Sequence, residues 1–523
     1  MRGFEPFKRA SRIILLAAAT FGLSTIVAAQ QRLALGVDAA VDAVDSYRRA
    51  REKAIVEDFV ALLSLPNVAV ELADMQRNAD HITGLLEARG FRTQRLRAGG
   101  APYVYAELLS DTATETLLIY AHYDGQPVLD EDWTYPPFSP TLLDAPVSAG
   151  GRRLDIAAID TEFDPEWRLY ARSAGDDKMP IIALLHALDA LAANDLPLSV
   201  NLKLLLDGEE EQGSPTVGRI LDQHRELFEA DLMLFCDGPM HQSRRAQLVF
   251  GVRGITGVDI TAYGANRPLH SGHYGNWAPN PIMQLAYLLT SLRDETGRIL
   301  IDGYYDDVVA LGEADIAAIA AMPDMTAVLQ DELAVHTPEG DGARLEELIA
   351  LPSANARGFV AGGVGNQGSN IVLSTATVSL DFRLVANQSP ARVRELVEAH
   401  VRRQGFHIVT EDPPNETLRN SPKVAKLQWR AGTPALKTAL NDPTSIRLAG
   451  LLRLISPDLI LTPTMGGTLP LHEFGTRLTA PIIILPLANH DNNQHAENEN
   501  IRLQNLWDAI LVFGVLLAYY DQA

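Results

Sequence analysis

The sequence predicts an α/β domain into which a separate α+β domain is inserted. Short apolar runs alternate with helical segments in the first part of the chain, which is typical of a sheet flanked by helices. From residue 248 alternating strand patterns take over, and after about residue 425 the α/β pattern returns. The chain has 523 residues, and domains usually hold ~100–200. We therefore expect two domains.

Helical periodicity in the first domain covers residues 41–64 and 76–90. Four short apolar or alternating runs predict strands, and a helix over Met179–Ala193 separates the second of them from the third. These strands are Tyr103–Leu109, Thr116–Tyr120, Ser199–Leu206 and Asp231–Phe235. In sheets of this class, functional side chains gather at the carboxyl ends of the strands.

The inserted domain is expected to contain three strands and a helix, at Gln247–Val252, Gly257–Tyr263, Thr377–Leu384 and Pro390–Gln404. Residues 304–350 are rich in Ala, Asp and Glu and predict helical additions to this domain. A strand at Ile482–Leu487 and a helix at Leu503–Tyr519 then complete the first domain. The expected boundaries are 41–247 and 425–523 for the first domain and 248–415 for the insertion.

The N-terminus has the pattern of a secretory signal peptide over residues 1–29. Four basic residues precede an apolar run from Ile13 to Val27, and Val27-Ala28-Ala29 has the small residues of a cleavage site. We expect export to the periplasm or secretion. An uncleaved membrane anchor is the alternative, since the run approaches the ~20 residues that a spanning helix needs. No later segment is predicted to span a membrane.

Composition excludes some classes of partner. The net charge is −22, whereas phosphate binding needs clustered Lys and Arg, so nucleic acid is not an expected partner. The single cysteine, Cys236, excludes an intrachain disulfide and is predicted to be a small buried side chain.

Five short blocks of acidic residues or histidine each follow an apolar run. They are Tyr120-Ala-His122-Tyr-Asp124, Gly175-Asp176-Asp177-Lys178, Asp207-Gly-Glu209-Glu210-Glu211, Cys236-Asp237-Gly238 and Gln494-His495-Ala-Glu497-Asn-Glu499. Carboxylate oxygens and imidazole nitrogens are suitable ligands for divalent metals. Together the blocks predict a hydrolytic site with two metal ions, in which one carboxylate bridges both.

The residue types suggest a division of roles. His122 can supply an imidazole nitrogen, and Asp124 can fix its tautomer. Asp176, between a glycine and a helix, is suited to the bridging position. The three adjacent carboxylates Glu209–Glu211 cannot all face one site, so one is expected to bind metal and a neighbour to act on water. Asp237 and His495 complete the set.

In this order the blocks resemble the superfamily of zinc hydrolases that contains carnosinase, carboxypeptidase G, aminoacylase and acetylornithine deacetylase. The family's H-x-D motif matches His122-Tyr-Asp124, and its D-x-K motif contains Asp176. Its E-E-x-G-S motif matches Glu210-Glu211-Gln-Gly-Ser214. The resemblance extends from about residue 45 to 520. It implies a zinc-peptidase-like domain, with a mixed sheet flanked by helices, and an inserted lid and dimerisation domain.

The resemblance also implies a role for each ligand. One metal takes His122, Asp176 and Asp237, and the other takes Asp176, Glu211 and His495. Glu210 is the general base, and Asp124 is a catalytic residue beside His122. The two cofactors are divalent ions, with zinc expected and cobalt or manganese as alternatives.

Matches in the second domain concern the substrate. Leu269-His270-Ser271-Gly272 resembles a motif whose histidine reaches the partner's active site, which implies a homodimer. Arg383, in Ser379-Leu-Asp-Phe-Arg383-Leu-Val, resembles the arginine that binds the substrate carboxylate, a role that suits a guanidinium. The loop Gly466-Gly467-Thr468 resembles one that contacts the same carboxylate through a hydroxyl and backbone donors, and Asn280 matches an asparagine near the substrate.

Three positions depart from the family pattern. Ala171-Arg172-Ser173 stands where G-R-G is usual, Met179 stands where a glycine follows the lysine, and Asn370 stands in place of a threonine. No metal-ligand position is altered. Arg383 has an alternative interpretation as the ion-pair partner of Asp381, and His186 is interpreted as a core residue.

The expected function is hydrolysis of amide bonds in dipeptides or in small substrates cleaved at the C-terminus. The nearest alternative is an N-acyl-amino-acid amidohydrolase that uses the same metals. A metal-stabilised binding protein without turnover is the alternative of another class. Glu210 argues against it, since a purely structural metal site has no need of an unligated carboxylate.

Overall fold

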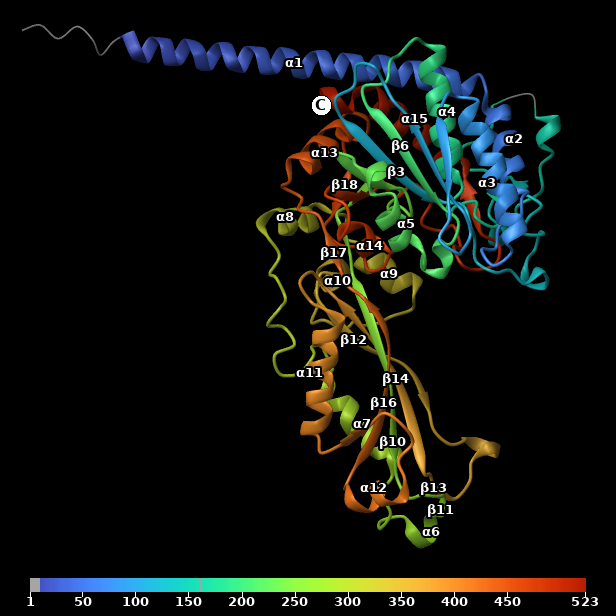
Figure 1. The fold of residues 1–523 in the computed structure, drawn as a ribbon, viewed down its shortest axis with the longest axis vertical. Helices are drawn as coiled ribbons and strands as arrows, with labels where there is room; N and C mark the ends of the chain where they lie inside the picture. The colour runs from blue at the N-terminus through green and yellow to red at the C-terminus, as the bar shows by residue number, and fades with distance from the viewer. Residues whose placement is uncertain (1–9, 160–161) are drawn as a thin grey trace, which may run out of the picture. The chain divides into compact units, whose positions relative to one another are not determined.

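The structure, a computed structural model, describes residues 10–159 and 162–523, without the side chains of residues 10–29 and 130. The chain forms two compact units (Figure 1). The first contains the chain up to Leu248, then Asp442–Leu459 and Leu478–Ala523, and the second contains Val249–Asn441 and Ile460–Arg477. The boundaries expected at 415 and 425 differ from this division, because residues 424–433 form a strand of the second unit's sheet.

The first unit is built around a mixed sheet whose strands follow the order β1-β2-β6-β3-β7-β19-β8. Strands β6, β3, β7 and β19 are parallel neighbours, whereas β1 and β2 are antiparallel. The bounds are β1 Arg92–Leu96, β2 Tyr103–Leu108, β3 Thr116–His122, β6 Asn201–Asp207, β7 Leu232–Phe235, β8 Gln247–Val249 and β19 Ile482–Ile484. A smaller sheet joins β20 (Asn500–Arg502), β5 (Arg168–Tyr170) and β4 (Thr141–Leu143). The predicted α/β architecture is therefore confirmed.

Helices flank the principal sheet. Their bounds are α1 Ala10–Arg49, α2 Glu52–Leu63, α3 Leu72–Glu87, α4 Met179–Ala193, α5 Val217–Gln223, α13 Pro443–Ile455 and α15 Leu503–Tyr519. Helices α4 and α15 are apolar on nearly all sides because they pack against each other and against α1. The single helix expected over 41–64 is two helices, since α1 ends at Arg49 and α2 begins at Glu52.

The segment expected as a signal peptide is described only in part. Residues 1–9 lie outside the described residues, and residues 10–29 are the first part of α1. Among the described residues, one helical stretch, Leu503–Gln522, is long and apolar enough to cross a membrane. The sequence interpretation did not identify it. Most of this stretch is buried inside the unit, where an apolar core helix has the same composition as a spanning one.

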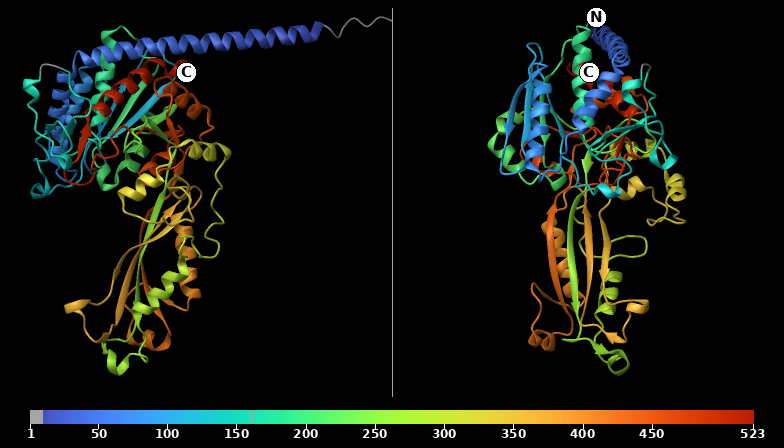
Figure 2. Two further views of the ribbon diagram at one scale, coloured as in Figure 1. Left: turned by 180° about the vertical axis from the view of Figure 1, so that it is seen from behind. Right: turned by 90° about the vertical axis from the view of Figure 1, so that its right-hand side faces the viewer.

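The second unit contains a long antiparallel sheet (Figures 1 and 2) with the strand order β12-β14-β10-β16-β15. The bounds are β10 Gly254–Tyr263, β12 Ser353–Val360, β14 Thr375–Leu384, β15 His407–Val409 and β16 Val424–Thr433. Only β15 runs parallel to its neighbour. Helices α7 (Pro281–Leu292) and α11 (Pro390–Arg403) pack on the sheet, so the predicted α+β character is confirmed.

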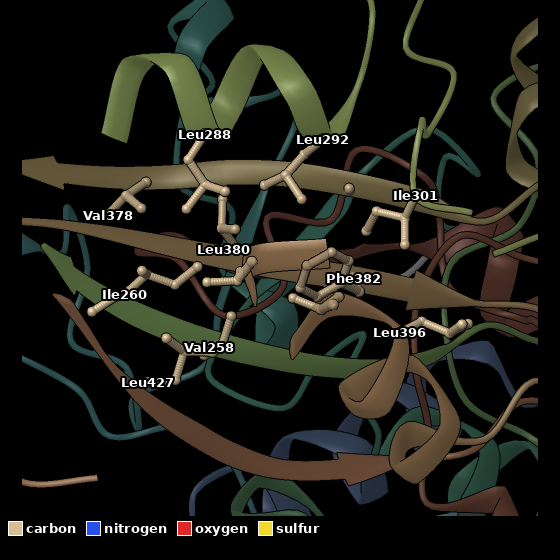
Figure 3. Close-up of a cluster of buried hydrophobic side chains, with 14 of the residues drawn as sticks. Val258, Ile260, Leu288, Leu292, Ile301, Val378, Leu380, Phe382, Leu396 and Leu427 are labelled. Atoms are coloured by element: carbon tan, nitrogen blue, oxygen red, sulfur yellow. The ribbon is translucent and has the colours of Figure 1, made fainter. Parts of the chain in front are cut away.

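Alternate residues of the strands form one apolar face under these two helices. Val258 and Ile260 of β10 and Leu380 of β14 point to this face, as strand geometry requires. Leu288 of α7 and Leu396 of α11 complete the same core (Figure 3). The opposite faces of β10 and β14 are only partly buried.

The remaining elements of the second unit are short. Within residues 304–350, helices are confined to α8 (Glu313–Ala321), α9 (Thr326–Glu332) and α10 (Leu345–Ile349), with irregular chain between them. The others are β9 Gly251–Val252, β11 Leu269–His270, α6 Ser271–Tyr274, β13 Ile371–Val372, α12 Asn415–Asn420, β17 Leu436–Lys437, β18 Ile460–Thr462 and α14 Leu471–Gly475.

Candidate metal centre

Three parallel strands, β3, β6 and β7, end in three of the five acidic and histidine blocks at one edge of the sheet. In the register, His122 at the end of β3 is paired with Asp207 at the end of β6. Tyr120 of β3 is paired with Phe235, the last residue of β7. The blocks that follow β6 and β7 therefore leave the sheet beside His122, at the edge where α/β proteins bind their ligands.

His122, Asp176 and Asp237 form the first group of possible metal ligands. All three are buried, and one ligand atom from each lies within 4.8 Å of the others. The Nε2 atom of His122 is 2.7 Å from Oδ1 of Asp176 and 4.0 Å from Oδ2 of Asp237. Ligands ~2.1 Å from one ion can be no more than ~4.2 Å apart, and these spacings satisfy that limit.

Asp176, Glu211 and His495 form the second group. The Nε2 atom of His495 lies 3.2 Å from Oδ2 of Asp176 and 3.2 Å from Oε2 of Glu211. Asp176 thus directs one carboxylate oxygen to each group. This is the arrangement that a carboxylate bridging two ions requires.

Asp124 connects the histidine to the glutamates. Its Oδ1 atom is 3.3 Å from Nδ1 of His122, on the side of the ring opposite the ligand nitrogen. The same carboxylate accepts hydrogen bonds from the backbone N–H groups of Glu210 (3.1 Å) and Glu211 (3.0 Å). One buried carboxylate therefore lies beside the imidazole and also orients the backbone that carries both glutamates.

Glu210 belongs to neither group of ligands. Burial, followed by the charge of Asp237, raises its pKa well above the ordinary value for a glutamate. Glu209, the third adjacent carboxylate, instead accepts hydrogen bonds from the Tyr103 hydroxyl (2.9 Å) and the Thr216 backbone N–H (2.9 Å). The Glu209 side chain therefore has a structural role, and Glu210 is the glutamate that is available as a general base.

The electrostatics of the cluster favour a bound cation. Burial and the charge of Asp176 raise the pKa of both Glu211 and Asp237 to about 7. Hydrogen bonding to Asp176 raises the pKa of His495 to about 9. Metal binding needs the carboxylates of Asp176, Asp237 and Glu211 in their ionised form, and divalent ions would supply the positive charge that offsets their mutual repulsion. Imidazole and carboxylate ligands with this deficit of positive charge fit two divalent ions of the zinc type.

Glu499 holds the loop that carries Asp176, a role that the sequence interpretation missed. Its buried carboxylate accepts hydrogen bonds from the backbone N–H groups of Ser173 (3.0 Å), Gly175 (3.1 Å) and Asp176 (3.0 Å). Arg172 adds a guanidinium contact of 2.7 Å. Glu499 stands in the same block as His495, and that proximity was the only signal in the sequence.

We expect substitution of Glu499 by glutamine to lower both the unfolding temperature and the affinity for metal. In the variant, the NH2 group of the glutamine amide would face N–H donors that the Glu499 carboxylate now accepts from. The charge that pairs with Arg172 would also be lost, and removing one partner of a buried ion pair typically costs ~3–5 kcal/mol of folding stability. Thermal unfolding with and without added zinc measures both effects. Glu497→Gln, an exposed residue two positions away, is the matched control, and equal behaviour of the two variants would contradict the assigned role.

One departure from the family motif lies in the loop that carries Asp176. Ser173, in place of a glycine, is buried and accepts a hydrogen bond from the amide of Asn67 (2.8 Å). Its hydroxyl donates to the backbone carbonyl of Asp124 (3.2 Å). His186 lies outside the cluster, buried with Nε2 3.2 Å from Oδ2 of Asp58, and Cys236 is buried as predicted.

The expected substrate residues all lie in the second unit. Arg383 donates to the Thr468 hydroxyl (3.0 Å), so the structure brings these two together beside Gly467. Nε of Arg383 is also 3.7 Å from Oδ2 of Asp381, so the alternative ion pair is present. His270 is exposed at the start of α6, where its Nδ1 accepts from the Gly272 N–H (3.1 Å).

Asn280 has a structural task. Its side-chain oxygen accepts hydrogen bonds from the backbone N–H groups of Ile282 (3.0 Å) and Met283 (3.4 Å), which caps helix α7. The substrate role expected for Asn280 stays a prediction, as do those of Gly467, Thr468, Arg383 and His270.

Comparison with known proteins identifies the family. The sequence pattern of peptidase family M20/M25/M40 matches residues 118–518. The chain belongs to this family. The peptidase is 26% identical to a human Beta-Ala-His dipeptidase over 429 residues, which are 79% of this chain and 76% of the relative. It is 24% identical to a Cys-Gly metallodipeptidase of Schizosaccharomyces pombe over 79% of this chain and 81% of the relative.

A solved structure supports the fold. The M20 family metallo-carboxypeptidase of Sulfolobus solfataricus aligns with a TM-score of 0.70 at 27% identity, over 89% of this chain and 99% of that one. The predicted zinc-peptidase-like fold, with its second inserted domain, is thereby confirmed, and so is the prediction that the protein is a peptidase. The peptidase's ligand set stays a prediction supported by the geometry above.

Proposed function

We propose that this protein is a dipeptidase that depends on two metal ions and cleaves the amide bond of small peptides with a free carboxylate. The observation that carries the proposal is the pair of ligand groups sharing Asp176, with Glu210 beside them in neither group. The relatives named as dipeptidases support the choice of dipeptides over longer chains.

The residues that would hold the ions are His122, Asp176 and Asp237 for one and Asp176, Glu211 and His495 for the other. When bound, zinc or another divalent ion supplies a Lewis acid for the amide carbonyl and lowers the pKa of an attacking water. Asp124 keeps His122 in the tautomer whose Nε2 faces the ligand side.

Glu210 is proposed as the general base. A carboxylate with a raised pKa accepts a proton from water at neutral pH and can return it to the leaving amine. Its position is fixed by the hydrogen bond from its own backbone N–H to Asp124. The base and the ligand nitrogen of His122 are thus oriented by one carboxylate.

We also propose a homodimer that forms through the second unit. Two surfaces there are open to a partner. On α7, Met283 and Tyr287 are 46% and 67% exposed, and β12 is an edge strand, with residues 355–360 exposed. An exposed edge strand offers unpaired backbone groups to another chain. His270 of the partner subunit would then stabilise the oxyanion at the metal centre.

The dimer is tested by complementation. His270→Ala and Glu210→Gln should each be inactive alone, whereas their co-expression should restore activity, because a mixed dimer contains one site with both native residues. Sedimentation gives the oligomeric state of each preparation. A fully active monomer, or no recovery on co-expression, would reject the shared site.

A substrate panel tests the reaction itself. Free dipeptides, the matching N-acyl amino acids and C-terminally amidated dipeptides are compared by kcat/KM on the metal-loaded enzyme. We expect the free dipeptides to be the best substrates. A preference for N-acyl amino acids would instead indicate the amidohydrolase, and absence of turnover would indicate a binding protein.

Export is proposed from residues 1–29 alone. The mature N-terminus, determined by mass spectrometry on protein from fractionated cells, distinguishes a cleaved signal peptide from a retained anchor. An intact N-terminus in the membrane fraction would overturn cleavage.

A further inference from the structure

Two arginines of the second unit contact the same glycine loop. In the register of β10 and β14, Arg383 is paired with Ile255, so Arg253, two residues earlier, lies at the same end of the sheet. Nε of Arg253 donates to the carbonyl of Gly466 (3.2 Å), and Arg383 donates to the Thr468 hydroxyl. The loop 465–468 thus lies against both guanidinium groups.

The proton of the Thr468 hydroxyl is already used between these arginines. The hydroxyl donates its single proton to the backbone carbonyl of Arg253 (2.7 Å) and accepts from Nη1 of Arg383 (3.0 Å). A hydroxyl has only one hydrogen to give. Thr468 therefore holds Arg383 in position rather than donating to a substrate carboxylate, and a second donor must take its expected place.

Arg253 can supply this second donor, because in the part of the chain that the structure describes only its Nε is engaged with the loop and its Nη groups remain available. Its side chain is half-buried, and among the described residues no carboxylate lies within salt-bridge distance of it. Its Nη2 atom lies beside Gly466, 3.5 Å from the position that a Cβ on that residue would take. Asp381, the carboxylate whose charge acts on Arg253, lies 3.7 Å from Nε of Arg383.

The charge at this loop is unbalanced. The charge of one carboxylate, that of Asp381, acts on both guanidinium groups. Burial, with a contribution from the charge of Arg383, lowers the pKa of Arg253 to about 10. Two cations held this close are stabilised by an anion between them, and a carboxylate matches the planar donors of a guanidinium.

We propose that Arg253 is a second ligand for the substrate carboxylate, which is held between the guanidinium groups of Arg253 and Arg383. This rests on the proposed function, because it assigns the carboxylate of that substrate to a place. The pair makes a free carboxylate a strict requirement. A peptide amide would leave the two guanidinium groups with Asp381 as their shared counter-charge and no second carboxylate.

The test compares a dipeptide with its C-terminal amide in Arg253→Gln, Arg253→Lys and the wild type. For the free dipeptide, Arg253→Gln should raise KM by about 10- to 100-fold, the effect of losing a charge-assisted hydrogen bond, with kcat much less changed. Arg253→Lys should recover part of the loss because it keeps the charge. The amide, poor in the wild type, should not become poorer in Arg253→Gln.

Arg430→Gln is the matched control. Arg430 lies on β16 of the same sheet, but Asp259 at 2.7 Å neutralises it, so KM should stay at the wild-type value. Equal losses on the dipeptide and its amide would assign Arg253 to loop support alone and overturn the proposal. If the wild type prefers N-acyl amino acids, the same comparison is made with an N-acyl amino acid and its amide. Failure of the wild type on both classes would refute the proposed function, and the arginine pair with it.

Discussion

Glu210→Gln is expected to reduce kcat by at least 100-fold while two metal ions remain bound. General-base catalysis contributes ~10²–10⁴-fold, and the amide of glutamine cannot take a proton from water. The ligands are unaffected, since Glu210 belongs to neither group. Its backbone N–H still reaches Asp124, so the geometry of the loop is kept. Steady-state kinetics together with metal analysis of the purified variant measures both properties.

Glu209→Gln provides the contrast at the neighbouring position. Glu209 accepts hydrogen bonds from Tyr103 and Thr216 inside the fold, so its replacement should lower the unfolding temperature and leave kcat of the folded protein near the wild-type value. Turnover by Glu210→Gln within tenfold of the wild type, or loss of metal from it, would remove the basis for the assigned base.

Removal of metal is expected to abolish activity and to destabilise the first unit. Asp176, Asp237 and Glu211 are held close together with little compensating charge. A ligand present at a thousandfold its Kd stabilises the folded state by ~4 kcal/mol. Thermal unfolding is measured after chelation and again after addition of zinc, cobalt or manganese. The rise in unfolding temperature gives the stabilisation by each ion and ranks the three ions by it. Unchanged activity after complete chelation would contradict the metal-dependent mechanism.

The metal-free protein should show a characteristic dependence on pH. Folding raises the pKa of Glu211 and Asp237 to about 7, so the folded state binds more protons than the unfolded state between pH ~4 and 7. Their contribution to stability is present at acid pH and is lost as the pH rises through 7. The pKa of Asp176 is lowered, which acts in the opposite direction but below pH 4. Metal-free protein should therefore unfold at a higher temperature at pH 5.5 than at pH 8.

The sequence predicts most of the fold because its patterns are local. The helices Met179–Ala193 and Leu503–Tyr519 have the predicted bounds, since both are continuous apolar stretches. Strand β16 was not predicted, because its stability comes from pairing with β10, far away in the sequence. The break between α1 and α2 has no Gly or Pro to mark it.

The candidate site, like the fold, could be predicted from the sequence only in part. Residue types and motif order were enough to select the five candidate ligands, and the structure brings them together in two groups that share Asp176. The supporting contacts could not be read from the sequence. That Asp124 accepts from the N–H groups of Glu210 and Glu211, that Glu499 supports Asp176, and that the Thr468 hydroxyl is already engaged all depend on distances across the fold.

The attachment of Asp176 to Glu499 has a consequence for synthesis of the protein. Asp176 leaves the ribosome early, but the carboxylate that fixes its loop, and His495 of the second ligand group, are among the last residues to emerge. The whole inserted unit is made in between. A growing chain therefore carries most of its ligands without the support that orders them. If the proposed ligand set is right, the nascent polypeptide is expected to lack peptidase activity until translation is nearly finished.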